Sequence, residues 1–147
     1  MIHLDTNYLI GLAVRGSTPA ANVDHWLASG ETLGASALNR SRSTVTPPLA
    51  SGETLGASAL AWTEFLNGPV SANEIALVEA VIAGNVLAFE KATASLAAQL
   101  FNQTGRRRGS RFDCLIAATA IAANAEFATE NQKDFLPFVA QGLKLKN

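Results

Sequence analysis

The strongest constraint on the fold is a stretch from Phe112 to Ala125, which is long enough for a helix, almost entirely apolar, and interrupted by one carboxylate, Asp113. At about 3.6 residues per turn this helix is apolar on every face, which is typical of a helix buried on all sides. A buried carboxylate without a partner costs on the order of several kcal/mol unless a cation, a donor or the helix start stabilises it. Asp113 is therefore either a first-turn acid that accepts backbone N–H groups or one member of a larger acidic site.

The composition favours a single α/β domain over residues 1–147. The chain is 48% hydrophobic, 16% charged and only 7% aromatic, which excludes a disordered protein and disfavours an all-β sandwich. The lone Cys114 excludes an intramolecular disulfide and a cysteine-based metal cluster, and we expect an inert core thiol. No apolar run reaches the ~18 residues of a membrane span, and the first residues lack the basic region of a signal peptide. We expect a soluble cytoplasmic protein in a reducing compartment.

Short apolar runs alternate with helical patterns, which predicts a layered α/β fold with a mainly parallel sheet. The expected strands are 1–4, 54–58, 86–89 and 126–129, with a last strand or tail at 143–147. The expected helices are 8–14, 20–27, 62–66, 75–83, 92–103 and 112–125. Ser71 and Glu74 have capping-box spacing before the fourth of these helices, and Gly84 closes it. No helix is predicted after residue 129.

An internal duplication is the most unusual feature of the chain. Residues 28–38 recur letter for letter as residues 50–60, an offset of 22 residues. The segment between them is polar and ends in two prolines, and two copies are too few for a solenoid, so we interpret a tandem duplication inserted into a finished domain. Both copies hold a potential strand. Because the second copy leads directly into the next helix, we expect Thr54–Ser58 to take the sheet position and the first copy to be a loop, an edge strand or a mobile flap.

Polar residues follow the expected strands or begin helices near them: Asp5, Glu64, Asp113, Asn131 and Asp134. In a parallel sheet such loops meet at one edge, where crowded carboxylates repel one another unless a cation neutralises them. Mg²⁺ or Mn²⁺ fits this oxygen-rich set. Such an ion lowers the pKa of a bound water and stabilises charge on a phosphate.

A basic loop lies directly before the apolar helix, with four of the eleven cations at Arg106, Arg107, Arg108 and Arg111. These arginines either bind a polyanion such as RNA or form a solvated loop. An acidic metal site beside a basic rim indicates phosphodiester hydrolysis. Two simpler alternatives are also open. One is that Asp5 or Asn7 serves only as the cap of the next helix, and the other is that Glu64 is a solvated surface residue.

Four motifs in order along nearly the whole chain resemble the PIN-domain ribonucleases, and most of all the VapC-type toxins of bacterial toxin–antitoxin pairs. They are residues 4–7, 61–68, 113–120 and 129–135. The resemblance implies a three-layer PIN-like fold, in which helices flank a central, mainly parallel sheet. Without the 22 additional residues Glu64 falls at position 42, close to the family's usual spacing from the first aspartate.

By this resemblance, Asp5, Glu64 and Asp113 hold the Mg²⁺ or Mn²⁺ ion of an endoribonuclease. Thr6 and Asn7 then support the first aspartate, and Thr129 orients the site. The fourth acidic position is either that of Asn131 or that of Asp134, because relatives differ in which of the two carries the carboxylate. The resemblance also implies a homodimer and inhibition by a small antitoxin protein whose peptide fills the groove.

Two other functions compete with this interpretation. The first is a catalytically impaired PIN-like binding module whose insertion disturbs the active site, since a surface insertion costs a fold little. The second is a receiver domain or a haloacid-dehalogenase-like phosphatase, which also places Asp at strand ends. The phosphatase pattern requires a second Asp where Asn7 stands, and a receiver requires a late-strand lysine before a turn; neither pattern is convincing in this chain.

Overall fold

Five short parallel strands form the centre of the computed structural model, which describes residues 1–28, 54–106 and 108–146. The strands are β1 (Ile2–Leu4), β2 (Leu55–Ser58), β3 (Val86–Leu87), β4 (Glu126–Ala128) and β5 (Lys144–Leu145). Their order across the sheet is β3-β2-β1-β4-β5, and every neighbouring pair is parallel. The mainly parallel sheet predicted from the sequence is confirmed.

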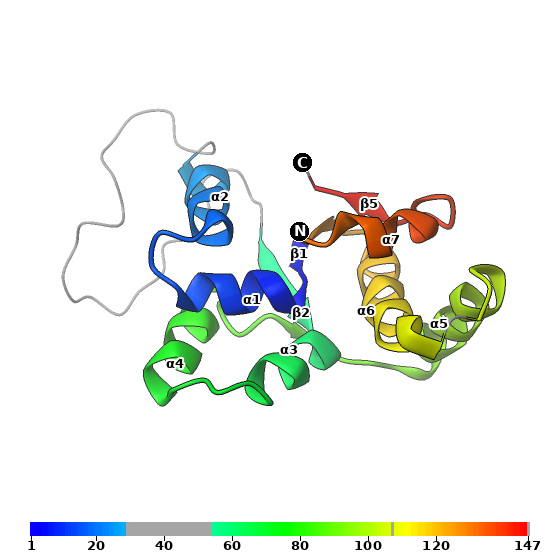
Figure 1. Cartoon of the computed structure of the whole chain (residues 1–147), viewed down its shortest axis with the longest axis horizontal. Coiled ribbons are helices and arrows are strands. Elements are labelled where there is room, and N and C mark those ends of the chain that lie inside the picture. Colours follow the sequence, from blue (N-terminus) through cyan, green and yellow to red (C-terminus); the bar gives the residue numbers. More distant parts are fainter. Residues whose placement is uncertain (29–53, 107, 147) are drawn as a thin grey trace.

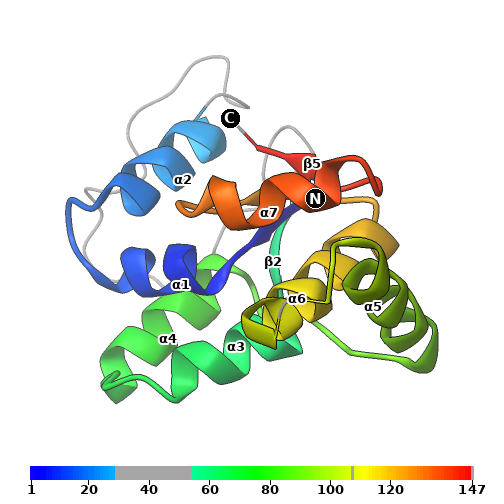
Figure 2. The same ribbon diagram turned by 45° about the vertical axis from the view of Figure 1, so that its right-hand side comes forward.

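Helices cover both sides of this sheet. They are α1 (Thr6–Ala13), α2 (Thr18–Ala28), α3 (Ala59–Leu66), α4 (Ala72–Val81), α5 (Lys91–Gln103), α6 (Arg111–Ala122) and α7 (Gln132–Val139), with a single 3₁₀ turn, η2 (Arg108–Ser110), before α6. Helix α1 packs against α2, α3 and α4, whereas α6 packs against α5 and α7 (Figures 1 and 2). None of the helices in the described ranges is long and apolar enough to cross a membrane.

The central strand β1 is buried on both faces, as expected for a parallel strand with helices above and below it. His3 is fully buried within it and lies against Phe127 of β4, with ring centroids 5.6 Å apart. Burial lowers the pKa of His3 to about 4, so the imidazole is neutral at physiological pH. His3 is a core residue.

The second copy of the duplicated segment occupies the sheet, as predicted. Strand β2 lies between β1 and β3, and Gly56 stands opposite His3. A Cβ on Gly56 would lie 3.0 Å from the backbone oxygen of Asn85, so this close strand contact favours glycine. The first copy lies outside the described residues.

Two local predictions are wrong. Helix α6 ends at Ala122 rather than Ala125, and it is not buried on all sides because Phe112 in its first turn is 54% exposed. No helix was predicted at the position of α7, which contains Pro137. The proline removes one helical hydrogen bond, but Phe135 and Phe138 of the same helix are buried in the core and stabilise it.

Candidate active site

Asp5 stands directly after β1 and is almost completely buried, with 5% of its surface exposed. One carboxylate oxygen, Oδ1, accepts the backbone N–H of Thr6 at 2.8 Å, so Asp5 caps α1. The other, Oδ2, accepts the hydroxyl of Thr129 at 2.7 Å. Asp5 therefore caps a helix and is also held in one orientation by a residue at the end of β4.

Thr129 is the centre of a small network that fixes the loop after β4. Its hydroxyl oxygen accepts the side-chain amide of Asn7 at 3.2 Å and the backbone N–H of Asn131 at 3.0 Å. The Asn7 side-chain oxygen in turn accepts the backbone N–H of Glu130 at 3.2 Å. The start of α1 and the loop before α7 are thereby joined next to Asp5.

Glu64 reaches the same region from α3. It is half-buried, and its Oε2 accepts the hydroxyl of Thr6 at 2.6 Å. Helix α3 is anchored at its start by buried Ser58, whose hydroxyl accepts the backbone N–H of Ala61 at 3.0 Å. The alternative of a freely solvated Glu64 is wrong.

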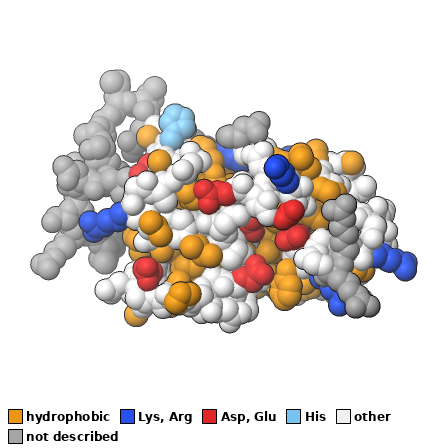
Figure 3. Space-filling model, viewed as in Figure 1, with side chains coloured by type: hydrophobic (Ala, Val, Ile, Leu, Met, Phe, Trp, Pro, Cys, Tyr) orange, Lys and Arg blue, Asp and Glu red, His pale blue; other side chains and the backbone are white. Residues whose placement is uncertain are grey.

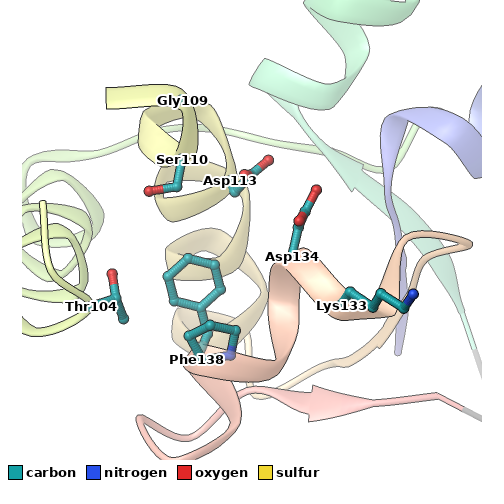
Figure 4. Close-up of a pocket in the computed structure, with 8 residues that line it drawn as sticks. Thr104, Gly109, Ser110, Asp113, Lys133, Asp134 and Phe138 are labelled. Atoms are coloured by element: carbon teal, nitrogen blue, oxygen red, sulfur yellow. The ribbon is translucent and has the colours of Figure 1, made fainter. Parts of the chain in front are cut away.

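Asp113 in the first turn of α6 and Asp134 in the first turn of α7 complete the acidic group. Their carboxylates lie toward one another across the opening between the two helices (Figure 4). Asp134 accepts the side-chain amide of Asn131, whereas no hydrogen bond from a described residue reaches the Asp113 carboxylate. The alternative of Asp113 as a simple acceptor of first-turn N–H groups is therefore not supported. Acidic side chains gather in the middle of this face of the molecule (Figure 3).

The negative charges of these acids affect the pKa values of Asp113 and Asp5. Burial raises the pKa of Asp113 to about 6, and the carboxylates of Asp134, Asp5 and Glu64 add to the shift. Burial is also the main cause of the raised pKa of Asp5, with a contribution from Glu64, while hydrogen bonds from Thr129 and Thr6 oppose it. No Lys or Arg of the described residues forms an ion pair with any of the four acids. Within the part of the chain that the structure describes, the site is therefore an acidic cluster without a paired cation.

The chemistry of these side chains suits a hard divalent cation, because such ions prefer oxygen ligands. A positive charge would also relieve the repulsion among the carboxylates. Within the described ranges, however, no three side chains of the His, Cys, Asp and Glu types stand close enough to hold a metal ion as they lie. Binding of an ion therefore has to draw the carboxylates together.

The structure describes only part of the basic loop before α6, residues 106–111. Arg111 begins α6 and its guanidinium lies 5.6 Å from the centre of the Phe101 ring. Arg106 is exposed, with a positive φ of 55°. Arg107 and the side chain of Arg108 lie outside the described residues.

Three polar residues beside the acids were not predicted from the sequence. They are Thr104, Ser110 and Lys133, which line the same cavity as Asp113 and Asp134. Ser110 comes just before a predicted helix and Lys133 lies between two candidate site residues, so both carried a weak positional signal. Thr104 had none, because only the packing of α5 against α6 brings it there.

The chain matches a known family. The model of the PIN domain family matches residues 2–136, nearly the whole chain, so the protein belongs to the PIN domain family. Proteins of this family are nucleases, and they generally use divalent metal ions.

Several solved structures have the same fold. FitAcB from Neisseria gonorrhoeae has a TM-score of 0.63 and 21% identity, over 99% of this chain and 97% of that chain. VapBC2 from Rickettsia felis, bound to a DNA fragment from their promoter, has a TM-score of 0.62 and 20% identity, over 100% and 98%. A toxin–antitoxin complex from Klebsiella pneumoniae has a TM-score of 0.61 and 20% identity, over 92% and 91%. A comparison with curated proteins finds no match.

Proposed function

We propose that this protein is a metal-dependent endoribonuclease and the toxin of a toxin–antitoxin system. The observation that carries the proposal is the cluster of Asp5, Glu64, Asp113 and Asp134, four acids from four separate elements that form no ion pair with a Lys or Arg of the described residues. Membership of a nuclease family agrees with it.

Asp5, Glu64 and Asp113 would hold Mg²⁺ or Mn²⁺, with Asp134 as the fourth acid. The bound ion supplies a water of lowered pKa and positive charge beside the phosphate. Thr129 orients the Asp5 carboxylate and Thr6 orients that of Glu64, so that two acids are fixed before an ion binds. Asp113 accepts no such hydrogen bond from the described residues, so its side chain could turn toward the ion.

Asp134, rather than Asn131, supplies the fourth carboxylate. This assignment is supported by its charge, which raises the pKa of Asp113 more than the charge of Asp5 or Glu64 does. Asn131 donates its side-chain amide to Asp134 and its backbone N–H to Thr129, which makes it a positioning residue.

The proposed partners are RNA, a cognate antitoxin protein and a second copy of this chain. Arg106, Arg107, Arg108 and Arg111 would attract the RNA backbone through counterion release. The antitoxin is supported by the solved structures of the same fold, among which is a toxin–antitoxin complex. The homodimer is supported by the family resemblance and is tested by the molecular mass in solution.

The decisive experiment measures cleavage of a single-stranded RNA by the purified chain with Mg²⁺, with Mn²⁺ and with a chelator. We expect metal-dependent cleavage that the Asp5→Asn variant loses by at least about 100-fold, because the variant keeps the shape of the side chain without its charge. Metal-independent cleavage, or equal cleavage by the variant, contradicts the proposal. No cleavage by either protein, with retained binding of a partner protein, favours the impaired binding module instead.

A further inference from the structure

We propose that Phe101 of α5 is a positioning residue, whose ring holds the Arg111 guanidinium in place to bind the backbone phosphates of RNA. The inference rests on the proposed ribonuclease function and deepens it, because it names an uncharged residue on which substrate binding depends. It is carried by the contacts of Phe101 with two arginines and by the place of Arg111 beside the acids.

The ring of Phe101 contacts Arg111 where the end of α5 and the start of α6 pack together (Figures 1 and 2). The guanidinium carbon of Arg111 lies 5.6 Å from the ring centre, within the ~6 Å over which an aromatic face attracts a cation. Phe101 is partly buried and packs against the core, whereas Arg111 is exposed. The ring is therefore a fixed support, and the guanidinium on it remains accessible to a ligand.

The backbone of Phe101 positions a second arginine, Arg106. The Arg106 N–H donates to the Phe101 carbonyl oxygen at 3.0 Å, and Gly105 between them has a φ of 88°. This is the Schellman arrangement that ends many helices. Arg106 is exposed and has a φ of 55°, which is uncommon for a residue with a Cβ. Phe101 thus fixes the positions of both Arg106 and Arg111.

Arg111 lies close to the acids but is not paired with them. Asp113 follows two residues later in α6, about 3 Å farther along the helix axis and about 200° around it. Within the described ranges, neither Arg111 nor Arg106 forms an ion pair with a carboxylate. An unrestrained arginine so near several carboxylates would pair with one of them. The contact with Phe101 explains why Arg111 is instead directed toward α5.

The charge of Arg111 suits an anionic ligand, because no described carboxylate neutralises it. The axial separation of about 3 Å from Asp113 is well below the Debye length of about 8 Å, so a polyanion at the acids is also attracted by Arg111. A guanidinium binds a phosphate through two parallel hydrogen bonds, which a held arginine forms at a lower entropic cost. An acidic segment of a partner protein is the competing ligand, and the test below distinguishes it from RNA.

Substitutions at Phe101 separate its aromatic face from its packing. Phe101→Leu and Phe101→Met keep an apolar side chain and remove the ring, whereas Phe101→Tyr keeps the ring. Leu96→Ala is the packing control, because Leu96 is also partly buried on α5 and lies five residues before Phe101. Arg111→Gln removes the charge itself at an exposed position.

The first measurement is binding of labelled oligouridylate and oligoadenylate by fluorescence anisotropy, in a chelator and over a range of salt concentrations. Arg111→Gln should weaken binding about fivefold at about 0.1 M salt and reduce the salt slope by about 0.7, the values for one phosphate contact with a single strand. Phe101→Leu and Phe101→Met should show the same loss with both oligonucleotides, since phosphates carry no sequence information. Phe101→Tyr and Leu96→Ala should bind like the parent.

The double variant tests whether Phe101 acts through Arg111. In the Arg111→Gln background, Phe101→Leu should have no further effect on binding, because the guanidinium that the ring holds is absent. In cleavage with Mg²⁺ or Mn²⁺, Phe101→Leu should raise KM about fivefold and change kcat by less than about twofold. An undiminished loss in the Arg111→Gln background, or an equal loss in Leu96→Ala, indicates packing alone and overturns the proposal.

The remaining outcomes separate this proposal from the ribonuclease function. RNA cleavage with parent-like KM and RNA binding in Phe101→Leu overturns the positioning role and leaves the function intact. Coupled loss of RNA binding in the two single variants, without cleavage by any protein, overturns the function and supports the positioning role. Parent-like RNA binding by Arg111→Gln overturns the positioning role, and loss of oligoglutamate binding by this variant would then assign Arg111 to an acidic protein segment. Absence of RNA binding and cleavage overturns both proposals.

Discussion

Asp113 illustrates how burial and neighbouring charge act together on one side chain. Its folded pKa of about 6 lies above its ordinary value of 3.8, so the folded protein holds this proton more tightly than the unfolded chain does. Between these two values the free energy of unfolding falls as pH rises, because the folded state has to lose a proton that the unfolded state has already lost. At neutral pH the protein therefore carries a destabilising charge at the candidate active site.

Asp113→Asn should accordingly raise the thermal stability of the metal-free protein at pH 7.5. After allowance for solvent screening of this half-buried group, we expect a gain of about 1 kcal/mol, or roughly 2–4 °C. The gain should shrink toward pH 4, where the parent carboxyl is protonated. Circular dichroism melts between pH 4 and pH 8 in a chelator measure the effect. A gain that is independent of pH points to packing and contradicts the charge argument.

Thr129 sets the orientation and the proton affinity of Asp5, since its hydrogen bond is the largest influence that lowers the pKa of that acid. Thr129→Val should lower kcat by at least about tenfold and move the acidic limb of the pH–rate profile to higher pH, because Asp5 loses its donor. Thr129→Ser keeps the hydroxyl and should remain within a few-fold of the parent. If Thr129→Val changes kcat without moving the profile, Thr129 acts through shape alone.

At the scale of the element, the sequence was most informative where local signals agree. Three features were predictable because each depends on residues that are neighbours in the sequence. They are the position of Asp5 at a strand end, the capping box of Ser71 and Glu74, and the choice of the second copy for β2. Helix α7 was not predicted, and it forms although it contains Pro137, because Phe135 and Phe138 are buried in the core. The contact between Thr6 and Glu64, 58 residues apart, depends on tertiary packing and left no local trace.

Helix α3 carries Glu64, so we expect the N-cap of this helix to affect both the stability of the fold and the proposed nuclease activity. Ser58→Ala leaves the buried N–H of Ala61 without its acceptor, which should cost about 1–2 kcal/mol and loosen the start of α3. We expect a lower Tm and a loss of nuclease activity that persists well below the Tm. Ser71→Ala removes the cap of α4, which carries none of the proposed site residues, and should lower the Tm while activity at 25 °C is unchanged. Equal effects of the two variants on activity contradict the special role of the α3 cap.

At the scale of the whole molecule, strand order explains where the site forms. The chain passes outward from β1 to β2 and β3, then returns to place β4 and β5 on the other side of β1. Ligands of open parallel sheets bind at the carboxyl ends of the strands where the order reverses. Asp5 follows β1 and Thr129 follows β4, so the hydrogen bond between them lies at this reversal. The connection between α2 and β2, residues 29–54, contains none of the proposed site residues.

Removal of one repeat unit, residues 28–49, tests this account of the whole molecule. Because the copies are identical, Ala50 then takes the place of Ala28, and the connection between α2 and β2 shortens from 26 residues to four. The shorter closure should stabilise the fold by about 1–2 kcal/mol through loop entropy, since β2 and α3 keep all their contacts. We expect a Tm higher by roughly 3–6 °C and undiminished metal-dependent cleavage, which Asp5→Asn abolishes in the shortened chain as well. Cleavage by the shortened chain alone indicates that the additional residues impair the enzyme, whereas a shortened chain that does not fold shows that β2 requires the longer connection.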